Sequence, residues 1–249
     1  MDWGQRIDQV TAGYRDAALV IFVVKTGIFE GLAAGPRTPR EVAADRGLDT
    51  RATDVVMAAL CAAGMLEQDG ERFALPEGAR PYLLRDGSET RASIIGHNKA
   101  LIRRWARLDE VLKTGKPALQ EDRTDEEMRD FILGMENVSR RSSEEVAGMV
   151  DLSGCRRLLD LGGGPGTAAL TFARANPALE CVVFDLPGPV GIADEQIACA
   201  GLADRVSTVA GDFHADSFGD GFDVVYIANI LHMLGPEECV ALLKKAGAA

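Results

Sequence analysis

The stretch RRLLDLGGGPGTAALTFA, residues 156–173, decides the fold of this chain. An apolar run that contains Asp160 leads into four glycines within five positions, and a segment of helical composition follows. A buried strand, a glycine-rich turn and a helix in this order predict one unit of an α/β sheet. Glycines at such a turn let the backbone approach a ligand closely.

The same alternation continues downstream. We expect a second strand in ECVVFDL, ending at Asp185, a third in RVSTVAGDF, ending at Gly211-Asp212, and a fourth in FDVVYIANIL, reaching His232. Helices are expected over 167–175, over about 191–200, and from Pro236 onward. Because the strands are almost continuously apolar, they fit a parallel sheet covered on both faces. Residues 151–249 therefore predict a doubly wound α/β domain, similar to a Rossmann fold.

The glycine loop excludes some ligands and favours another. It is not a phosphate-binding loop of the GxxxxGK[ST] kind, and Thr167 occupies the third glycine position of the dinucleotide fingerprint. A tight strand-to-helix turn that binds no ligand remains an alternative interpretation of the loop. At the ends of the next two strands, Asp185 suits the two hydroxyls of a ribose, and Asp212 with Phe213 suits an adenine. Ligands of such sheets bind at the carboxyl ends of the strands, so the pattern predicts a nucleoside without a pyrophosphate.

The first 95 residues have a different pattern, mostly helical. Residues 38–47, TPREVAADRG, predict a helix capped by Thr38 and ended by Gly47. A second helix is expected over about 51–63, and MLEQDGERFAL predicts a hairpin around Asp69-Gly70. Two helices and a hairpin form the pattern of a winged helix-turn-helix.

DNA binding is a poor interpretation of this region. Residues 38–75 carry four basic and seven acidic side chains, a net charge of −3, and the second helix offers VVMAALCAA to a partner. Such a surface repels phosphates. The apolar helices, including a face made of Ala18, Leu19, Phe22 and Val23, instead favour packing or a homodimer.

Residues 96–150 predict two longer helices that link the two domains. In the first, Leu101, Trp105, Leu108 and Leu112 recur at helical spacing before Gly115. The second begins at Thr124, and its apolar face contains Phe131, Met135, Val138, Val146 and Met149.

Composition sets the remaining limits. The net charge of −11 argues against nucleic acids and anionic membranes as partners. Five scattered cysteines without a CxxC pair indicate reduced thiols, and we expect a cytoplasmic protein. No signal peptide is recognised, and the longest apolar run, residues 17–24, is too short to span a bilayer. Three histidines and scattered carboxylates do not form a metal ligand set, so no metal is expected.

Taken in order, LLDLGGGPGT, VVFDLP, GDF and IANILHMLGPEEC resemble the S-adenosylmethionine-dependent O-methyltransferases of the caffeic acid and acetylserotonin type. The resemblance covers nearly the whole chain and implies that residues 1–95 form a winged-helix dimerisation domain. It implies methyl transfer from S-adenosylmethionine to a hydroxyl of a small aromatic acceptor. A sulfonium methyl is already electrophilic, so alignment and removal of the phenol proton are what the protein must supply.

The resemblance also implies roles for single residues. Gly162 and Gly164 would pass close to the methionine part of the cofactor. Asp185 would hold the ribose, and Gly211, Asp212 and Phe213 would hold the adenine. His232 stands at the position of the general base, and Asn98, Phe131 and Met135 match residues that line the acceptor pocket. His97 and His214 receive no catalytic role.

Several features keep other functions open. Ala228 replaces a common lysine, HML replaces HDW after the fourth strand, and Val138 replaces a histidine found in some members. These departures concern the acceptor more than the cofactor. Methylation at nitrogen or carbon, a member that binds cofactor without transfer, a nicotinamide dehydrogenase and a winged-helix regulator remain as alternatives.

The end of the chain departs from the resemblance most. The family's sheet has seven strands in the order 3-2-1-4-5-7-6, whereas residues 151–249 supply four and end 17 residues after His232. We expect a truncated form with the half-sheet 3-2-1-4, a long apolar edge at strand four, and little transfer activity on its own.

Overall fold

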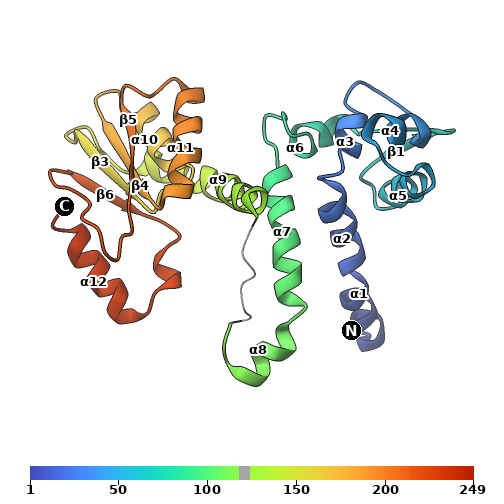
Figure 1. Cartoon of the computed structure of the whole chain (residues 1–249), viewed down its shortest axis with the longest axis horizontal. Helices are drawn as coiled ribbons and strands as arrows, with labels where there is room; N and C mark the ends of the chain where they lie inside the picture. The colour runs from blue at the N-terminus through green and yellow to red at the C-terminus, as the bar shows by residue number, and fades with distance from the viewer. Residues whose placement is uncertain (118–123) are drawn as a thin grey trace. The chain divides into compact units, whose positions relative to one another are not determined.

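The computed structural model describes residues 1–117 and 124–249, which form two compact units, Met1–Gly134 and Met135–Ala249 (Figure 1). The helix α9, Asp125–Met149, continues from the first unit into the second. The sequence predicts three parts, 1–95, 96–150 and 151–249, and the roles assigned to these parts stay predictions.

The first unit is mostly helical. Its elements are, in chain order, α1 (Trp3–Ala12), α2 (Tyr14–Val23), α3 (Ile28–Gly31), α4 (Pro39–Arg46), α5 (Thr50–Ala62), β1 (Glu67–Asp69), β2 (Arg72–Ala74), η1 (Glu77–Ala79), α6 (Arg80–Leu83), α7 (Ala92–Trp105), α8 (Leu108–Thr114) and the start of α9. The core collects side chains from α2 through α7, with Phe29, Leu32, Met57 and Leu60 fully buried.

In the helix-helix-hairpin segment, the residues predicted to begin and end the first helix do so. The Thr38 hydroxyl accepts the Glu41 N–H at 3.3 Å, and the Glu41 carboxylate accepts the Thr38 N–H at 2.7 Å, so the capping box is complete. Gly47 ends α4 with φ of 67°, a conformation that favours glycine. The hairpin forms where the sequence predicts it, with Asp69 paired to Arg72 and with Gly70 and Glu71 connecting the two strands. The name winged helix stays a prediction.

Two expectations for the first unit are wrong. The helix expected through residues 101–112 is broken: α7 ends at Trp105, and α8 starts at Leu108. The apolar spacing crosses the break without marking a buried face, since Trp105 is 69% and Leu112 is 78% exposed. Phe22, expected on the apolar face of its helix, is also exposed at 47%.

The second unit alternates strands and helices. After α9 come β3 (Arg157–Leu161), α10 (Thr167–Ala175), β4 (Glu180–Asp185), α11 (Pro187–Ala200), β5 (Val206–Ala210), β6 (Val224–Ile227), η2 (Leu231–Met233) and α12 (Pro236–Ala246). The sheet is parallel in the order β5-β4-β3-β6, which is the half-sheet 3-2-1-4 that the sequence predicts. Leu161 lies opposite both Phe184 and Ile227, so the carboxyl ends of β3, β4 and β6 meet at one edge.

Helices cover both faces of this sheet (Figure 1). One core joins α10, α11 and the end of α9 to side chains such as Leu158 and Val183. The other joins α12 and Phe218 to Leu159 and Leu161. Side chains alternate across a strand, so Asp160 points to the same face as Leu158, where α10 packs.

The boundaries of two elements differ from expectation. The fourth strand ends at Ile227, well before His232, and two residues later Asn229 adopts a left-handed φ of 57°. This conformation cannot continue a strand, so the long apolar edge expected over 222–231 is wrong. α11 begins at Pro187 rather than near Gly191, because the fixed φ of a proline suits the first position of a helix.

Candidate cofactor site at the glycine loop

The glycine loop is fixed to both neighbouring strands. The Gly162 N–H donates to the Phe184 carbonyl at 2.8 Å and so continues the pairing of β3 with β4. A β-carbon on Gly162, whose φ is 70°, would lie 2.8 Å from the Ile230 Cγ2 atom in the segment after β6. Only glycine fits there, because both the conformation and the space exclude a side chain.

Asp160 lies directly beneath the loop. Its carboxylate accepts the Ala169 N–H at 3.1 Å, and only 2% of the residue is exposed. A β-carbon on Gly163 would approach this carboxylate to 2.7 Å. The pKa of Asp160 is raised to about 7, mainly by burial and to a smaller extent by the nearby Asp185 carboxylate, against the lowering effect of the Ala169 N–H. Asp160 therefore connects strand β3, the loop and helix α10 through one buried group.

Asp185 closes the loop from the neighbouring strand. One carboxylate oxygen accepts the Gly164 N–H at 2.8 Å, and the other accepts the Leu186 N–H at 2.7 Å. Burial raises the pKa of Asp185, and both backbone donors lower it. Each carboxylate oxygen can accept a second hydrogen bond, so the group can still receive ligand hydroxyls.

The segment after β5 joins the same edge. The Gly211 N–H donates to the Asp185 carbonyl at 2.9 Å, and a β-carbon on Gly211 would lie 2.4 Å from the Phe184 ring. Asp212 is exposed, and its carboxylate accepts the His214 N–H at 2.8 Å. Phe213 is half-buried, with its ring 4.4 Å from that of His214. All six residues predicted to bind the cofactor therefore lie on three adjacent connections at one sheet edge.

Two residues of this edge were missed by sequence reasoning about the site. Lys245 of α12 donates to the Phe213 carbonyl at 2.8 Å and to the Asp216 carbonyl at 2.5 Å, which fixes the segment after β5. Nothing in the chain pattern connects a lysine of the last helix to that segment. The sequence does contain a signal for Asp160: an ionisable side chain inside an apolar strand costs free energy unless hydrogen bonds or charges compensate its burial.

His232 is placed differently. It lies in the short helix η2 and is exposed. Within residues 1–117 and 124–249, its side chain has no hydrogen-bonding partner. The Cys239 thiol donates to the carbonyl of Leu231, the residue before His232, at 3.4 Å. This contact fixes the backbone of η2 and does not involve the imidazole. Its role as a base stays a prediction.

The residues predicted to line the acceptor pocket fall in both units. Asn98 lies on α7 and is half-buried. Phe131 on α9 packs against the buried His97 ring at 5.1 Å, so His97 is part of the packing of the first unit. Met135, also half-buried, begins the second unit. Their role at an acceptor stays a prediction.

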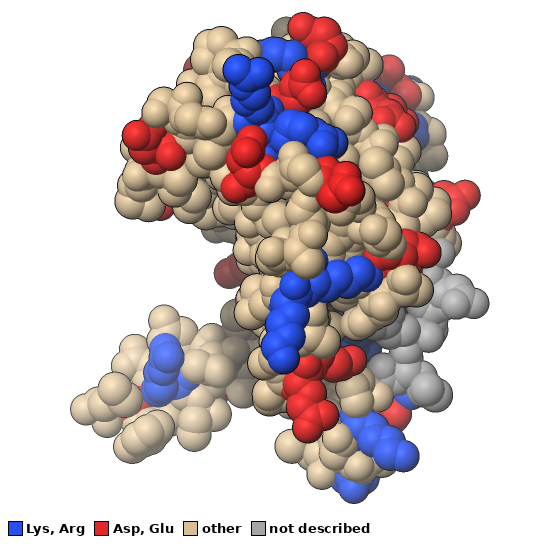
Figure 2. All heavy atoms as spheres, turned by 90° about the vertical axis from the view of Figure 1, so that its left-hand side faces the viewer, with Lys and Arg blue, Asp and Glu red and all other residues tan. Residues whose placement is uncertain are grey.

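Three further properties complete the description. Among the described residues, no group of three or more histidine, cysteine, aspartate or glutamate side chains is placed to hold a metal ion. None of the helices described has both the length and the apolar character needed to cross a bilayer. Acidic and basic side chains are interspersed on the face of the molecule that Figure 2 shows.

Comparisons with known proteins show the family to which this chain belongs. The model of a family described as O-methyltransferase domain matches residues 112–249. The chain belongs to this O-methyltransferase family. One relative, the 3-hydroxy-5-methyl-1-naphthoate 3-O-methyltransferase of Streptomyces sahachiroi, is 33% identical over 84% of this chain and 63% of its own length. Another, the L-tyrosine C(3)-methyltransferase of Streptomyces lavendulae, is 30% identical over 88% and 64%.

The fold is shared with solved structures. Human N-acetylserotonin methyltransferase in complex with SAM matches with a TM-score of 0.84 and 22% identity, over 98% of this chain and 76% of that one. This likeness concerns the fold. The chain spans somewhat less than two thirds of the length of the two curated relatives above.

Proposed function

We propose that this chain binds S-adenosylmethionine at the glycine loop and transfers its methyl group to a hydroxyl of a small aromatic acceptor. The observation that carries the proposal is the Asp185 carboxylate, which closes the loop through Gly164 at the edge where Gly211 and Asp212 also lie. Membership of the O-methyltransferase family and the naphthoate O-methyltransferase relative support the reaction class.

In this proposal the chain's residues have distinct tasks. Asp185 receives the ribose hydroxyls, and Asp212 with Phe213 holds the adenine. Gly162 and Gly164 lie against the methionine part, where no side chain obstructs the approach. His232 removes the phenol proton, since an imidazole titrates near neutrality and a phenol near pH 10. Asn98, Phe131 and Met135 contact the acceptor.

One alternative has a specific observation behind it. The tyrosine C(3)-methyltransferase shares 30% identity with this chain, so methylation at carbon on the same scaffold is the second candidate. Incubation with labelled S-adenosylmethionine and a panel of phenols, anilines and activated aromatic carbons, followed by mass spectrometry of the products, distinguishes the two. Label on oxygen supports the proposal, and label on carbon supports the alternative.

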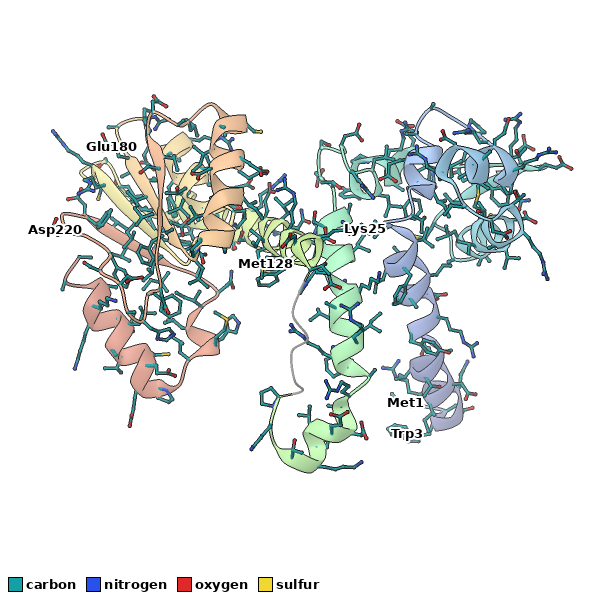
Figure 3. All side chains as sticks on the ribbon, viewed as in Figure 1. Met1, Trp3, Lys25, Met128, Glu180 and Asp220 are labelled. Carbon is teal, nitrogen blue, oxygen red and sulfur yellow. The ribbon has the colours of Figure 1, made fainter. Side chains whose placement is uncertain are left out.

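We also propose a cytoplasmic homodimer formed through the first unit. Helix α1 contributes no buried residue, and its side chains Trp3, Ile7 and Val10 are each at least 57% exposed. Figure 3 shows Trp3 at the start of this helix. Exposed apolar side chains at helical spacing are typical of interfaces. Light scattering at micromolar concentration is expected to give twice the chain mass. A monomer under these conditions would contradict the dimer.

A further inference from the structure

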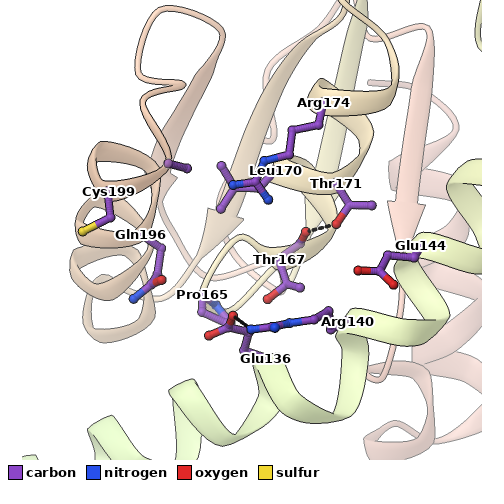
Figure 4. Close-up of a pocket in the computed structure, with 11 residues that line it drawn as sticks. Glu136, Arg140, Glu144, Pro165, Thr167, Leu170, Thr171, Arg174, Gln196 and Cys199 are labelled. Atoms are coloured by element: carbon purple, nitrogen blue, oxygen red, sulfur yellow. Dashed lines mark hydrogen bonds and ion pairs between the residues drawn. The ribbon is translucent and has the colours of Figure 1, made fainter. Parts of the chain in front are cut away.

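A cavity lies in the Met135–Ala249 unit beside the glycine loop, with Pro165 of that loop in its wall. It has a volume of about 330 Å³ and is bounded by α9, α10 and α11 (Figure 4). Its wall includes Arg140, Thr167 and Arg174. Asp185, Asp212 and Phe213 do not line it. The volume is at the lower end of the range for small-molecule pockets.

Thr167 gives the cavity a polar group that lacks a partner. The residue is 8% exposed, and no atom of the described residues hydrogen-bonds its hydroxyl. Its side chain points from α10 toward Arg140 in Figure 4. A buried hydroxyl without a partner is costly and therefore uncommon. A ligand oxygen in the cavity would satisfy it.

The start of α10 adds a positive electrostatic potential at the same place. Thr167 is the first residue of this nine-residue helix, and the preceding Gly166 has no side chain to cap it. The Ala169 N–H is already used by Asp160. Helix N-termini favour anions through their free N–H groups and the helix dipole.

Two guanidinium groups complete the arrangement. Arg174 has no ion-pair partner within the described residues, and Figure 4 shows its side chain folded back along α10 toward Leu170. Arg140 forms an ion pair with Glu136. Glu144, one helical turn further along α9, also lines the cavity and is exposed. Arg140 neutralises the Glu136 carboxylate. Arg174 and the start of α10 therefore face one remaining acidic group at the rim of the cavity, Glu144.

We propose that this cavity binds the oxyanion of a small molecule, a carboxylate or a phosphate group, through the Thr167 hydroxyl, the start of α10 and the guanidiniums of Arg174 and Arg140. None of the residues assigned to the cofactor lines this cavity, although Pro165 adjoins Gly164, and the proposal does not depend on the proposed reaction. Inorganic phosphate and acetate are the probes, because they carry the two oxyanion chemistries without other groups.

The test is a titration of the full chain with each probe, followed by NMR and by the shift in thermal unfolding temperature. Saturable binding is expected. Arg174→Gln is expected to weaken it about tenfold and Thr167→Val about fivefold, whereas Arg141→Gln, on the exposed side of α9, is expected to leave it unchanged. Glu144→Gln is expected to tighten it, because a repelling charge is removed. Tighter binding of phosphate or of acetate identifies the natural oxyanion, and either result supports the site.

A further readout separates binding from folding. Thr167→Val removes a buried polar atom without a partner, so it is expected to leave the unfolding temperature without phosphate unchanged or higher while reducing the shift that phosphate causes. Binding that persists at full strength in the Arg174→Gln and Thr167→Val variants would overturn the proposal, as would no saturable binding. Displacement of phosphate by saturating S-adenosylhomocysteine would also overturn it, because the anion would then occupy the cofactor site.

Discussion

The two ends of the sheet edge in the second unit differ in how firmly they are held. At β3 and β4, Asp160 and Asp185 accept backbone N–H groups, and Asp160 is buried while Asp185 is half-buried. At β6, the strand has four residues, Asn229 turns into a left-handed conformation, and His232 is exposed. The end at β3 and β4 is therefore held by side-chain carboxylates, whereas the end at β6 is held through backbone contacts such as that of Cys239 with the Leu231 carbonyl.

This difference follows from the chemistry proposed for each end. Holding a cofactor through backbone groups requires glycines in exact positions, and buried carboxylates can fix such a loop because their hydrogen bonds are strong in a poorly hydrated place. A general base needs access to the acceptor, which the exposed position of His232 provides.

The largest effect is expected at the exposed end. His232→Ala is expected to slow methyl transfer by about 10²–10⁴-fold, the range for loss of a general base, and to leave cofactor affinity unchanged. Single-turnover rates with labelled S-adenosylmethionine and an active phenol measure the first effect, and calorimetry measures the second. His214→Ala is the matched control. A His232 variant with a near-normal rate would assign that histidine a structural role only.

The buried end is expected to show a strong pH dependence of stability. The pKa of Asp160 is about 7 in the folded chain and about 4 in an unfolded one. Its contribution is therefore complete below pH 4 and is lost as the pH rises through 7, by on the order of 4 kcal/mol. Urea unfolding of the wild type at pH 5 and pH 8, compared with Asp160→Asn, measures this. Equal pH slopes for the two proteins would show that Asp160 does not titrate in this range.

Asp185→Ala sharpens the assignment of the cofactor. The variant loses a carboxylate that both closes the loop and is proposed to bind the ribose, so S-adenosylmethionine affinity is expected to fall by about 1–3 kcal/mol. Calorimetry gives the value. Asp194→Ala, whose carboxylate on α11 accepts the Thr208 hydroxyl, serves as a control at a second acidic residue of the unit. Unchanged affinity in Asp185→Ala would remove the ribose role.

Substitutions at two neighbouring glycines compare the cost of steric crowding with the cost of a left-handed backbone conformation. A β-carbon on Gly163 would lie 2.7 Å from the Asp160 carboxylate and 2.9 Å from Val183, so Gly163→Ala is expected to cost about 1–3 kcal/mol of stability. Gly164 has open space around it and φ of 55°, so Gly164→Ala is expected to cost about 1 kcal/mol. Chemical denaturation of both variants gives the comparison. The reverse order of the two costs would show that the loop relaxes around Asp160.

Local signals in the sequence determined much of the secondary structure of this protein. The strand RLLDL, the helix after Gly166 and the capping box at Thr38 lie where the sequence predicts them, since each depends on residues within a few positions. The order of the four strands agrees with what the resemblance to the O-methyltransferases implies, since local signals and the handedness of parallel connections leave more than one order open.

Only the tertiary structure decided which residues meet. The contact of Lys245 with the segment after β5, the burial of Asp160 beneath Gly163 and the cavity at Thr167 each join elements that are distant in the chain. The break between α7 and α8 and the early end of β6 have the same origin. Apolar spacing indicates which side chains could share a face, but packing against distant elements determines whether that face is buried and how far a strand extends.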